Sequence, residues 1–157
     1  MGRILTLREA LREREAYRAD GRKLVFTNGH FDLLHVGHLD YLEKARALGD
    51  ALFVGVNGDA SSADLKGSGR PIVPAHERAR LLAALEPVTA AIIFDAPTAD
   101  ALIEALKPEV YVKGGDYRDK RLPERPTVAA YGGEVVLIDY LPGHSTTALI
   151  QRIQALP

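Results

Sequence analysis

Two histidines three residues apart, His35 and His38, are the side chains of this chain best suited to chemistry. An apolar run at 24–28 and Gly29 precede them, and leucine and alanine recur at three-residue steps after them, so we expect a strand-to-helix junction here. The first turn of a helix has free backbone N–H groups and the positive end of the helix dipole, which favour a phosphate. Histidines at that point can follow phosphate charge as it moves during a reaction.

Two other interpretations of this histidine pair stay open. The pair can simply lie on the surface of a helix or cap it. It can also ligate a metal, but a zinc protease needs His-Glu-x-x-His, with ligands four residues apart and a carboxylate base. Here the spacing is three and the glutamate is missing, which disfavours zinc. Gly37, between the histidines, favours phosphate because it leaves room for a phosphate to approach the backbone.

Length, charge and composition exclude several classes of protein. The 157 residues suit one compact α/β domain, and the net charge of −1 gives no global positive field for a nucleic-acid or membrane partner. Absence of cysteine excludes disulfides, cysteine–zinc sites and thiol nucleophiles. Charged residues at 12–15 end any signal-peptide pattern, and no apolar run approaches the ~20 residues of a membrane span. We therefore expect a cytoplasmic protein.

Apolar runs and amphipathic stretches alternate along the chain. Strands are expected at 24–28, 51–56, 88–94, 110–112 and 134–138, and helices at 6–19, 35–48, 75–85, 99–106 and after Ser145. Glycine and proline predict a loop over 60–74. This alternation predicts a single three-layer α/β/α domain with a five-stranded parallel sheet. Five leucines are expected to pack in the core and to have no role in a site: Leu39, Leu42, Leu81, Leu82 and Leu85.

Polar residues follow four of the expected strands. They lie at 30–38, at Lys66 and Arg70, at 113–116 and at 145–147. Ligands of parallel sheets bind beyond the carboxyl ends of the strands. We therefore expect these distant segments to meet in one crevice.

The segment 29–38 resembles a known signature. Its Gly-His-Phe-Asp and His-Val-Gly-His are similar to the Gly-x-Phe-Asp and His-x-Gly-His of the cytidylyltransferase-like nucleotidyltransferase superfamily. Further segments resemble the heptose 1-phosphate adenylyltransferase family, namely 26–29, 55–59, 65–67, 70–71, 112–117, 132–136 and 143–147. The resemblance covers roughly 22–155. The family commonly has cysteine where this chain has His30, and its members are often fused to a sugar kinase domain.

The resemblance implies a Rossmann-like nucleotidyltransferase domain over 22–157, after an N-terminal helix within 1–21. It implies transfer of AMP from ATP to a sugar 1-phosphate, D-glycero-D-manno-heptose 1-phosphate, by direct in-line attack, giving ADP-heptose and pyrophosphate. It also implies Mg²⁺ as cofactor and a homodimer. Such chemistry needs alignment and charge neutralisation, and it needs no covalent protein nucleophile.

The same resemblance suggests roles for individual residues. It implies catalytic roles for three residues: His38 would contact the α-phosphate, His35 would contact the phosphates, and Lys66 would close over the substrates. The alternative for Lys66 is an ordinary surface lysine. Arg70 and His30 would contact the acceptor. Contacts to the nucleotide are expected from Thr27, Asn28, Gly29, Phe31, Gly37, Lys113, Gly114, Asp116, Ser145, Thr146 and Thr147.

Several of these positions have a plainer explanation. Gly114 with the following glycine can admit a purine or form a simple turn, and Asp116 can bind ribose or pair with a helix. Ser145 is an obvious N-cap. Asp32 can orient a histidine, bind magnesium or cap a turn. Arg78 resembles an arginine that some relatives aim at triphosphate, but an exposed arginine is the stronger expectation.

Other functions compete with adenylyl transfer. Within the superfamily the alternative is a cytidylyltransferase acting on glycerol 3-phosphate or a related small phosphate. A non-catalytic nucleotide-binding module is the alternative from another class. A dinucleotide oxidoreductase is disfavoured because no Gly-x-Gly-x-x-Gly follows the first strand. A fragment of an aminoacyl-tRNA synthetase is disfavoured because the chain lacks the length and the basic surface for tRNA.

Overall fold

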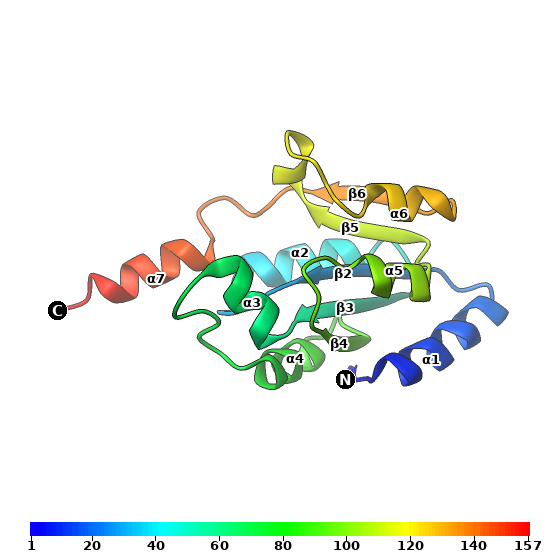
Figure 1. Ribbon diagram of the computed structural model, residues 1–157, viewed down its shortest axis with the longest axis horizontal. Helices are drawn as coiled ribbons and strands as arrows, with labels where there is room; N and C mark the ends of the chain where they lie inside the picture. Colours follow the sequence, from blue (N-terminus) through cyan, green and yellow to red (C-terminus); the bar gives the residue numbers. More distant parts are fainter.

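One parallel sheet of six strands forms the centre of the computed structural model, which describes all residues from Met1 to Pro157 (Figure 1). The strands are β1 (Arg3–Ile4), β2 (Leu24–Gly29), β3 (Ala51–Asn57), β4 (Ala90–Phe94), β5 (Val110–Gly114) and β6 (Glu134–Ile138). Their order is β1-β4-β3-β2-β5-β6. The expected five strands are all present, but the count of five is wrong. The sixth strand, β1, is two residues long and pairs with β4, so it is too short to give a periodic signal.

Seven α-helices connect or flank the strands. They are α1 (Leu7–Ala19), α2 (Val36–Arg46), α3 (Asp59–Lys66), α4 (Ala75–Ala84), α5 (Asp100–Leu106), α6 (Arg125–Ala130) and α7 (Thr146–Gln154), with a 3₁₀ turn at Gly115–Arg118. The prediction of a loop over 60–74 is wrong in its first half, because α3 occupies it and Lys66 is the last residue of that helix. Helix α6 was not expected, because its six residues are too few for a periodic pattern and include a proline.

Helices cover both faces of the sheet, which confirms the three-layer α/β/α architecture. One core of 15 buried residues packs α1, α5 and α6 on one face, through Ala10, Ile103 and Val128. The other core, also of 15 buried residues, packs α2 and α4 on the opposite face, through Leu42 and Leu82. Each fully buried leucine contributes roughly 1.5–3 kcal/mol.

One leucine of the expected core is misplaced. Leu81 is 51% exposed, whereas Leu82 is fully buried. The apolar stripe of α4 follows Ala75, Ala79, Leu82 and Ala83, and position 81 lies outside it. Position 81 lies about 100° around the helix from Leu82, on the side away from Ala83, and therefore faces outward.

The strand order reverses its direction at the centre of the sheet. From β2 the chain builds outward through β3 to β4 and then returns to the other side of β2 as β5. Such a reversal leaves space beyond the carboxyl ends of the two strands that flank it, here β2 and β5. Helix α7 extends away from the body at this end of the sheet, while α1 lies at the opposite side (Figure 1). None of the helices combines the length and the apolar character needed to span a bilayer.

Candidate active site

The histidine pair lies where β2 leads into α2. His35 is the N-cap of α2, with an extended backbone at φ −144° and ψ 170°. Its N–H donates a hydrogen bond to His38 Nδ1 at 3.4 Å, and the two imidazole rings stack with centroids 3.9 Å apart. Because Nδ1 of His38 accepts this bond, the proton of the neutral ring lies on Nε2. His38 Nε2 has no hydrogen-bond partner in the protein and is not among its buried unpartnered atoms, so it is free to donate to a ligand.

Both rings are neutral at physiological pH. Burial lowers the pKa of His38 to about 4, and the charge of the neighbouring His35 acts in the same direction. Burial, followed by the charge of His144, also lowers the pKa of His35. Two stacked imidazolium rings would repel each other, so the pair meets a ligand as neutral N–H donors.

Glycine and phenylalanine residues fix the positions of these rings. Phe31 has a left-handed backbone with φ 50°, and its ring packs against His38 with centroids 5.4 Å apart. A Cβ on Gly37 would lie 3.0 Å from Cε1 and Nδ1 of His35 and 3.0 Å from Cβ of His144. We expected Gly37 to leave room for a phosphate, but the His35 ring occupies this space. Gly37 therefore permits the stacked arrangement of the histidines.

Four cations act on His30, which lies at the rim of the sheet, just beyond the carboxyl end of β2. Burial lowers the pKa of His30 to about 4, and the positive charges of Lys66, Arg78, Lys113 and Arg70 add to that effect in this order. His30 Nδ1 is hydrogen-bonded to Ser62 Oγ at 2.8 Å. Two of these cations, Arg70 and Arg78, are paired with Asp32 and Asp59, whereas Lys66 and Lys113 have no carboxylate partner in an ion pair. The structure brings Lys66, Arg70 and Lys113 to the histidine segment, as their positions after the strands predicted.

Asp32 anchors the loop that follows α3. Its carboxylate accepts hydrogen bonds from the N–H groups of Ile72 and Val73 at 2.8–2.9 Å and from Arg70 Nε at 2.6 Å. Burial would raise the pKa of Asp32, but the bonds from Val73, Ile72 and Arg70 outweigh it and lower the pKa. Of the roles considered for Asp32, the loop-holding role therefore matches its contacts. Arg70 is held at the rim by this ion pair.

Arg78 is fully buried, so the expectation of an exposed arginine at this position is wrong. Its Nε donates to Val73 O, and its Nη1 donates to His30 O at 2.6 Å and to Asn57 O at 2.8 Å. Its Nη2 pairs with Asp59 at 2.8 Å. The guanidinium therefore joins the ends of β2 and β3 to α3 and to the loop before α4. These contacts occupy its Nε, Nη1 and Nη2 nitrogens.

The ends of β2 and β5 are joined by polar side chains. Lys113 Nζ donates to Asn28 O at 3.1 Å, and the Tyr111 hydroxyl donates to Asn28 Oδ1 at 2.7 Å. Thr27 is fully buried, and its hydroxyl bonds with the Tyr41 hydroxyl and with Val112 O. The Thr27 side chain thus braces the sheet below the rim, and the contact that we expect between Thr27 and a nucleotide is one of its backbone or shape. A Cβ on Gly29 would lie 3.1 Å from the Phe31 ring, so glycine at this position leaves room for that ring.

Gly114, the last residue of β5, and Gly115 pack against the two residues that follow β6. A Cβ on Gly114 would lie 2.0 Å from the Tyr140 hydroxyl, and one on Gly115 would lie 2.3 Å from Asp139 Oδ1. The close approach of these two side chains therefore explains both glycines. The groups that approach belong to this chain, whereas we had considered the approach of a purine. Burial, and then the charge of Asp116, raises the pKa of Tyr140 to about 12, so its phenol keeps its proton. Asp116 itself pairs with Lys120 at 3.6 Å.

The last helix begins as its sequence predicts. Ser145 Oγ accepts a hydrogen bond from the N–H of Ala148 at 3.0 Å, which confirms the N-cap. Thr146 and Thr147 form the first turn of α7. His144, directly before this cap, lies against Gly37 and influences His35, so it joins the site although we did not expect it there. Its position in the matched segment 143–147 was the signal that could have identified it.

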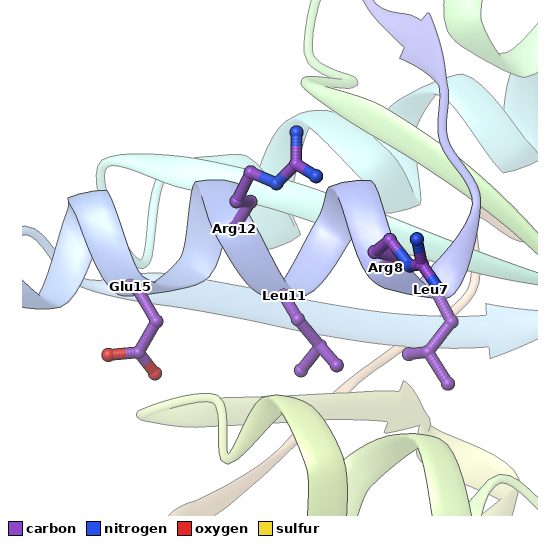
Figure 2. Close-up of a pocket in the computed structure, with 5 residues that line it drawn as sticks. All are labelled: Leu7, Arg8, Leu11, Arg12 and Glu15. Carbon is purple, nitrogen blue, oxygen red and sulfur yellow. The ribbon is translucent and has the colours of Figure 1, made fainter.

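The chain has no group of three or more His, Asp or Glu side chains that could hold a metal ion. A hollow of about 530 Å³ lies on α1, lined by Leu7, Arg8, Leu11, Arg12 and Glu15. Figure 2 shows Leu7 and Leu11 on the same side of that helix. None of the candidate site residues lines this hollow.

Known proteins are similar to this chain in sequence and in fold. "Bifunctional protein HldE" of Syntrophotalea carbinolica is 50% identical over 150 residues, which are 95% of this chain and 31% of that protein. The protein of the same name in Rhodopseudomonas palustris is 53% identical over 138 residues, 88% of this chain and 28% of that protein. The chain thus spans about three tenths of the length of these curated relatives.

Among solved structures, a lipopolysaccharide core biosynthesis protein of Thermoplasma volcanium aligns with a TM-score of 0.63 at 27% identity, covering 77% of this chain and 98% of that one. Pantothenate synthetase of Thermus thermophilus also aligns with a TM-score of 0.63, over 90% of this chain and 62% of that one, but at 19% identity it shows the fold alone. The profile of the family described as cytidylyltransferase-like matches residues 26–152. By its signature, its fold and this match, the chain belongs to the cytidylyltransferase-like family and is a nucleotidyltransferase.

Proposed function

We propose that the chain transfers AMP from ATP to D-glycero-D-manno-heptose 1-phosphate, giving ADP-heptose and pyrophosphate. A phosphate oxygen of the sugar 1-phosphate attacks the α-phosphorus of ATP. The bond between the α-phosphorus and the bridging oxygen breaks, and pyrophosphate leaves with that electron pair. The observation that carries this proposal is the stacked histidine pair at the start of α2, with a free Nε2–H on His38.

In this reaction negative charge grows on the α-phosphate oxygens and on the leaving group. His38 Nε2–H donates to an α-phosphate oxygen without first losing or gaining a proton, because its pKa of about 4 keeps it neutral. Lys113 and Arg70 are held at the rim by Asn28 and Asp32, so they neutralise phosphate charge with little reorganisation. Lys66 is exposed at the end of α3 and is free to reach the triphosphate.

Magnesium is expected to arrive with the triphosphate. Mg²⁺ is usually bound by substrate phosphates and water with one or two carboxylates, so a protein-built cage is not required. The carboxylate of Asp32 is engaged by Arg70, Ile72 and Val73, which argues against it as a ligand. The chain's own part is to bind and align the phosphates.

The sugar substrate is supported by the relatives at about half identity and by the lipopolysaccharide core biosynthesis protein of similar fold. The description of the family as cytidylyltransferase-like keeps a CTP-dependent transfer as the second candidate. Its acceptor would be glycerol 3-phosphate or a related small phosphate, as the resemblance of the sequence suggested. Pyrophosphate release should be measured with ATP and with CTP, each against heptose 1-phosphate, other sugar 1-phosphates and glycerol 3-phosphate. Turnover with ATP and the heptose is expected. Turnover with CTP alone would contradict the proposal, and binding without turnover would favour a non-catalytic module.

A further inference from the structure

A hydrogen bond joins His30, the residue directly after β2, to Ser62 in α3. His30 Nδ1 and Ser62 Oγ are 2.8 Å apart, and Ser62 is 1% exposed. The Ser62 hydroxyl has a single proton, and it donates this proton to Asn57 O at 3.4 Å. Towards the imidazole it therefore acts as the acceptor, so the proton of the neutral ring lies on Nδ1.

The other ring nitrogen of His30 then carries a lone pair. His30 is half-buried, and its Nε2 has no hydrogen-bond partner in the protein and is not among the buried unpartnered atoms, so it is open to a ligand. His38 is the opposite case, because its Nδ1 accepts the bond from the His35 N–H and its Nε2 carries the proton. The rim of the sheet thus presents one neutral imidazole that donates and one that accepts.

The charges that act on His30 select what this lone pair can bind. The four cations near the ring would repel a metal ion or an ammonium group. An ionised phosphate oxygen has no proton to donate. Protonation of the ring to meet such an oxygen is disfavoured, because burial, and then these charges, lower the pKa of His30 to about 4. A neutral donor remains, and in a phosphorylated sugar or polyol that donor is a hydroxyl group.

Carboxylates close to this segment are already engaged with cations. Asp32 is bound by Arg70 and by two backbone N–H groups, and Asp59 is bound by Arg78 and by one backbone N–H. A hydroxyl that approached these carboxylates would compete with their ion pairs. At His30 Nε2 it meets no competing donor from the protein.

We propose that His30 Nε2 accepts a hydrogen bond from a hydroxyl of the acceptor substrate, and that Ser62 is a positioning residue that keeps the ring in this tautomer. The inference rests on the proposed function, since it assigns a contact with the acceptor at the same site. It defines the acceptor as a phosphorylated sugar or polyol. A phosphate ester without hydroxyl groups should bind less well.

Nitrogen NMR of the intact chain labelled with ¹⁵N-histidine tests the tautomer without any turnover. The chemical shift of a ring nitrogen shows whether it carries a proton, and at neutral pH His30 should have a protonated Nδ1 and an unprotonated Nε2. Ser62→Ala should move the proton towards Nε2, because Nδ1 loses its acceptor. Ser61→Ala, whose hydroxyl bonds to Gly58 O, is the matched control and should keep the wild-type pattern. A protonated Nε2 in the wild type, or an unchanged pattern in Ser62→Ala, would overturn the proposal.

Kinetics test the hydroxyl contact itself. His30→Asn keeps an amide near the position of Nδ1 and removes Nε2. It should raise the KM for heptose 1-phosphate about tenfold, with little change in kcat or in the KM for ATP. Among mono-deoxy analogues of this acceptor, one should lose about tenfold in kcat/KM with the wild type and nothing further with His30→Asn. Independent losses for every analogue, or a raised KM for ATP instead, would overturn the proposal.

A binding measurement separates failure of this inference from failure of the proposed function. If heptose 1-phosphate gives no turnover, the proposed function fails. NMR titrations with glycerol 3-phosphate and with methyl phosphate then decide the present inference. The wild type should bind the hydroxylated ester more tightly and His30→Asn should bind the two alike, whereas equal affinities in the wild type would contradict the inference.

Discussion

At the scale of the residue, the stacked imidazoles determine how the site meets a phosphate. Their rings lie 3.9 Å apart, and burial lowers both pKa values, so the protein presents neutral donors instead of two cations. The full positive charges come from Lys66, Arg70 and Lys113 around His30. Directional donation and charge neutralisation are thus assigned to different side chains.

Replacing His38 tests the assignment of the directional donor. His38→Ala should lower kcat on the order of 10²-fold or more, the scale of one lost transition-state donor, with a smaller effect on the KM for ATP. Steady-state pyrophosphate release measures both constants. His76→Ala, at an exposed position on α4, is the matched control and should behave like the wild type. An unchanged kcat in His38→Ala would remove His38 from the chemistry.

Residue types and spacing predicted the position of the histidines at a helix start and the Ser145 cap, because each has a local signature. The expected strand ends predicted that Lys66 and Lys113 lie near His30. These sequence features could not predict the roles of Arg78 and Asp32, whose partners lie 5 to 48 and 38 to 41 residues away in sequence. Nor could they show that Tyr140 fills the space above Gly114. Such contacts depend on which strands become neighbours.

At the scale of the element, Arg78 holds together the segments that form the rim. It is buried on α4 and reaches the ends of β2 and β3, α3 and Val73 through four hydrogen bonds. Each of them ends on a backbone carbonyl or on Asp59, which would be left without this partner if the guanidinium were removed. The positions of His30 and of the loop before α4 therefore depend on one side chain.

Arg78→Met should destabilise the protein by about 3–5 kcal/mol, because it leaves buried carbonyl acceptors and the Asp59 carboxylate without their partner. Urea unfolding at neutral pH measures the change. Arg80→Met, at an exposed position two residues along the same helix, should stay within about 0.5 kcal/mol of the wild type. Equal stability of the two variants would mean that the Arg78 contacts contribute little.

The long elements were predictable, since buried strands and amphipathic helices have clear periodicity. The elements that were missed are short or polar. Strand β1 has two residues, α6 has six, and α3 has the sequence Asp-Ala-Ser-Ser-Ala-Asp-Leu-Lys, which resembles a loop in composition. Their formation depends on packing against the finished sheet instead of on local pattern.

At the scale of the whole molecule, the buried histidines link stability to pH. The pKa of His30 and that of His38 are both lowered from 6.5 to about 4. Between these values the unfolded chain binds protons that the folded chain does not, so the free energy of unfolding must fall as the pH drops from about 6.5 to about 4. Above about pH 6.5 these two residues should contribute no pH dependence.

Urea unfolding at pH 7, 6 and 5 measures this linkage. The wild type should lose stability across the series, and His30→Asn combined with His38→Asn should lose less. His76→Ala should keep the wild-type slope, since that histidine is exposed. A double variant with the wild-type slope would show that other groups produce the pH dependence.

The most direct test of the site is a crystal structure of the chain with a non-hydrolysable ATP analogue. An oxygen of the α-phosphate is expected about 2.7–3.2 Å from His38 Nε2, with the remaining phosphates beside Lys113 and Lys66. The result that would contradict this account is a nucleotide bound elsewhere, or at the rim with both imidazoles turned away from its phosphates.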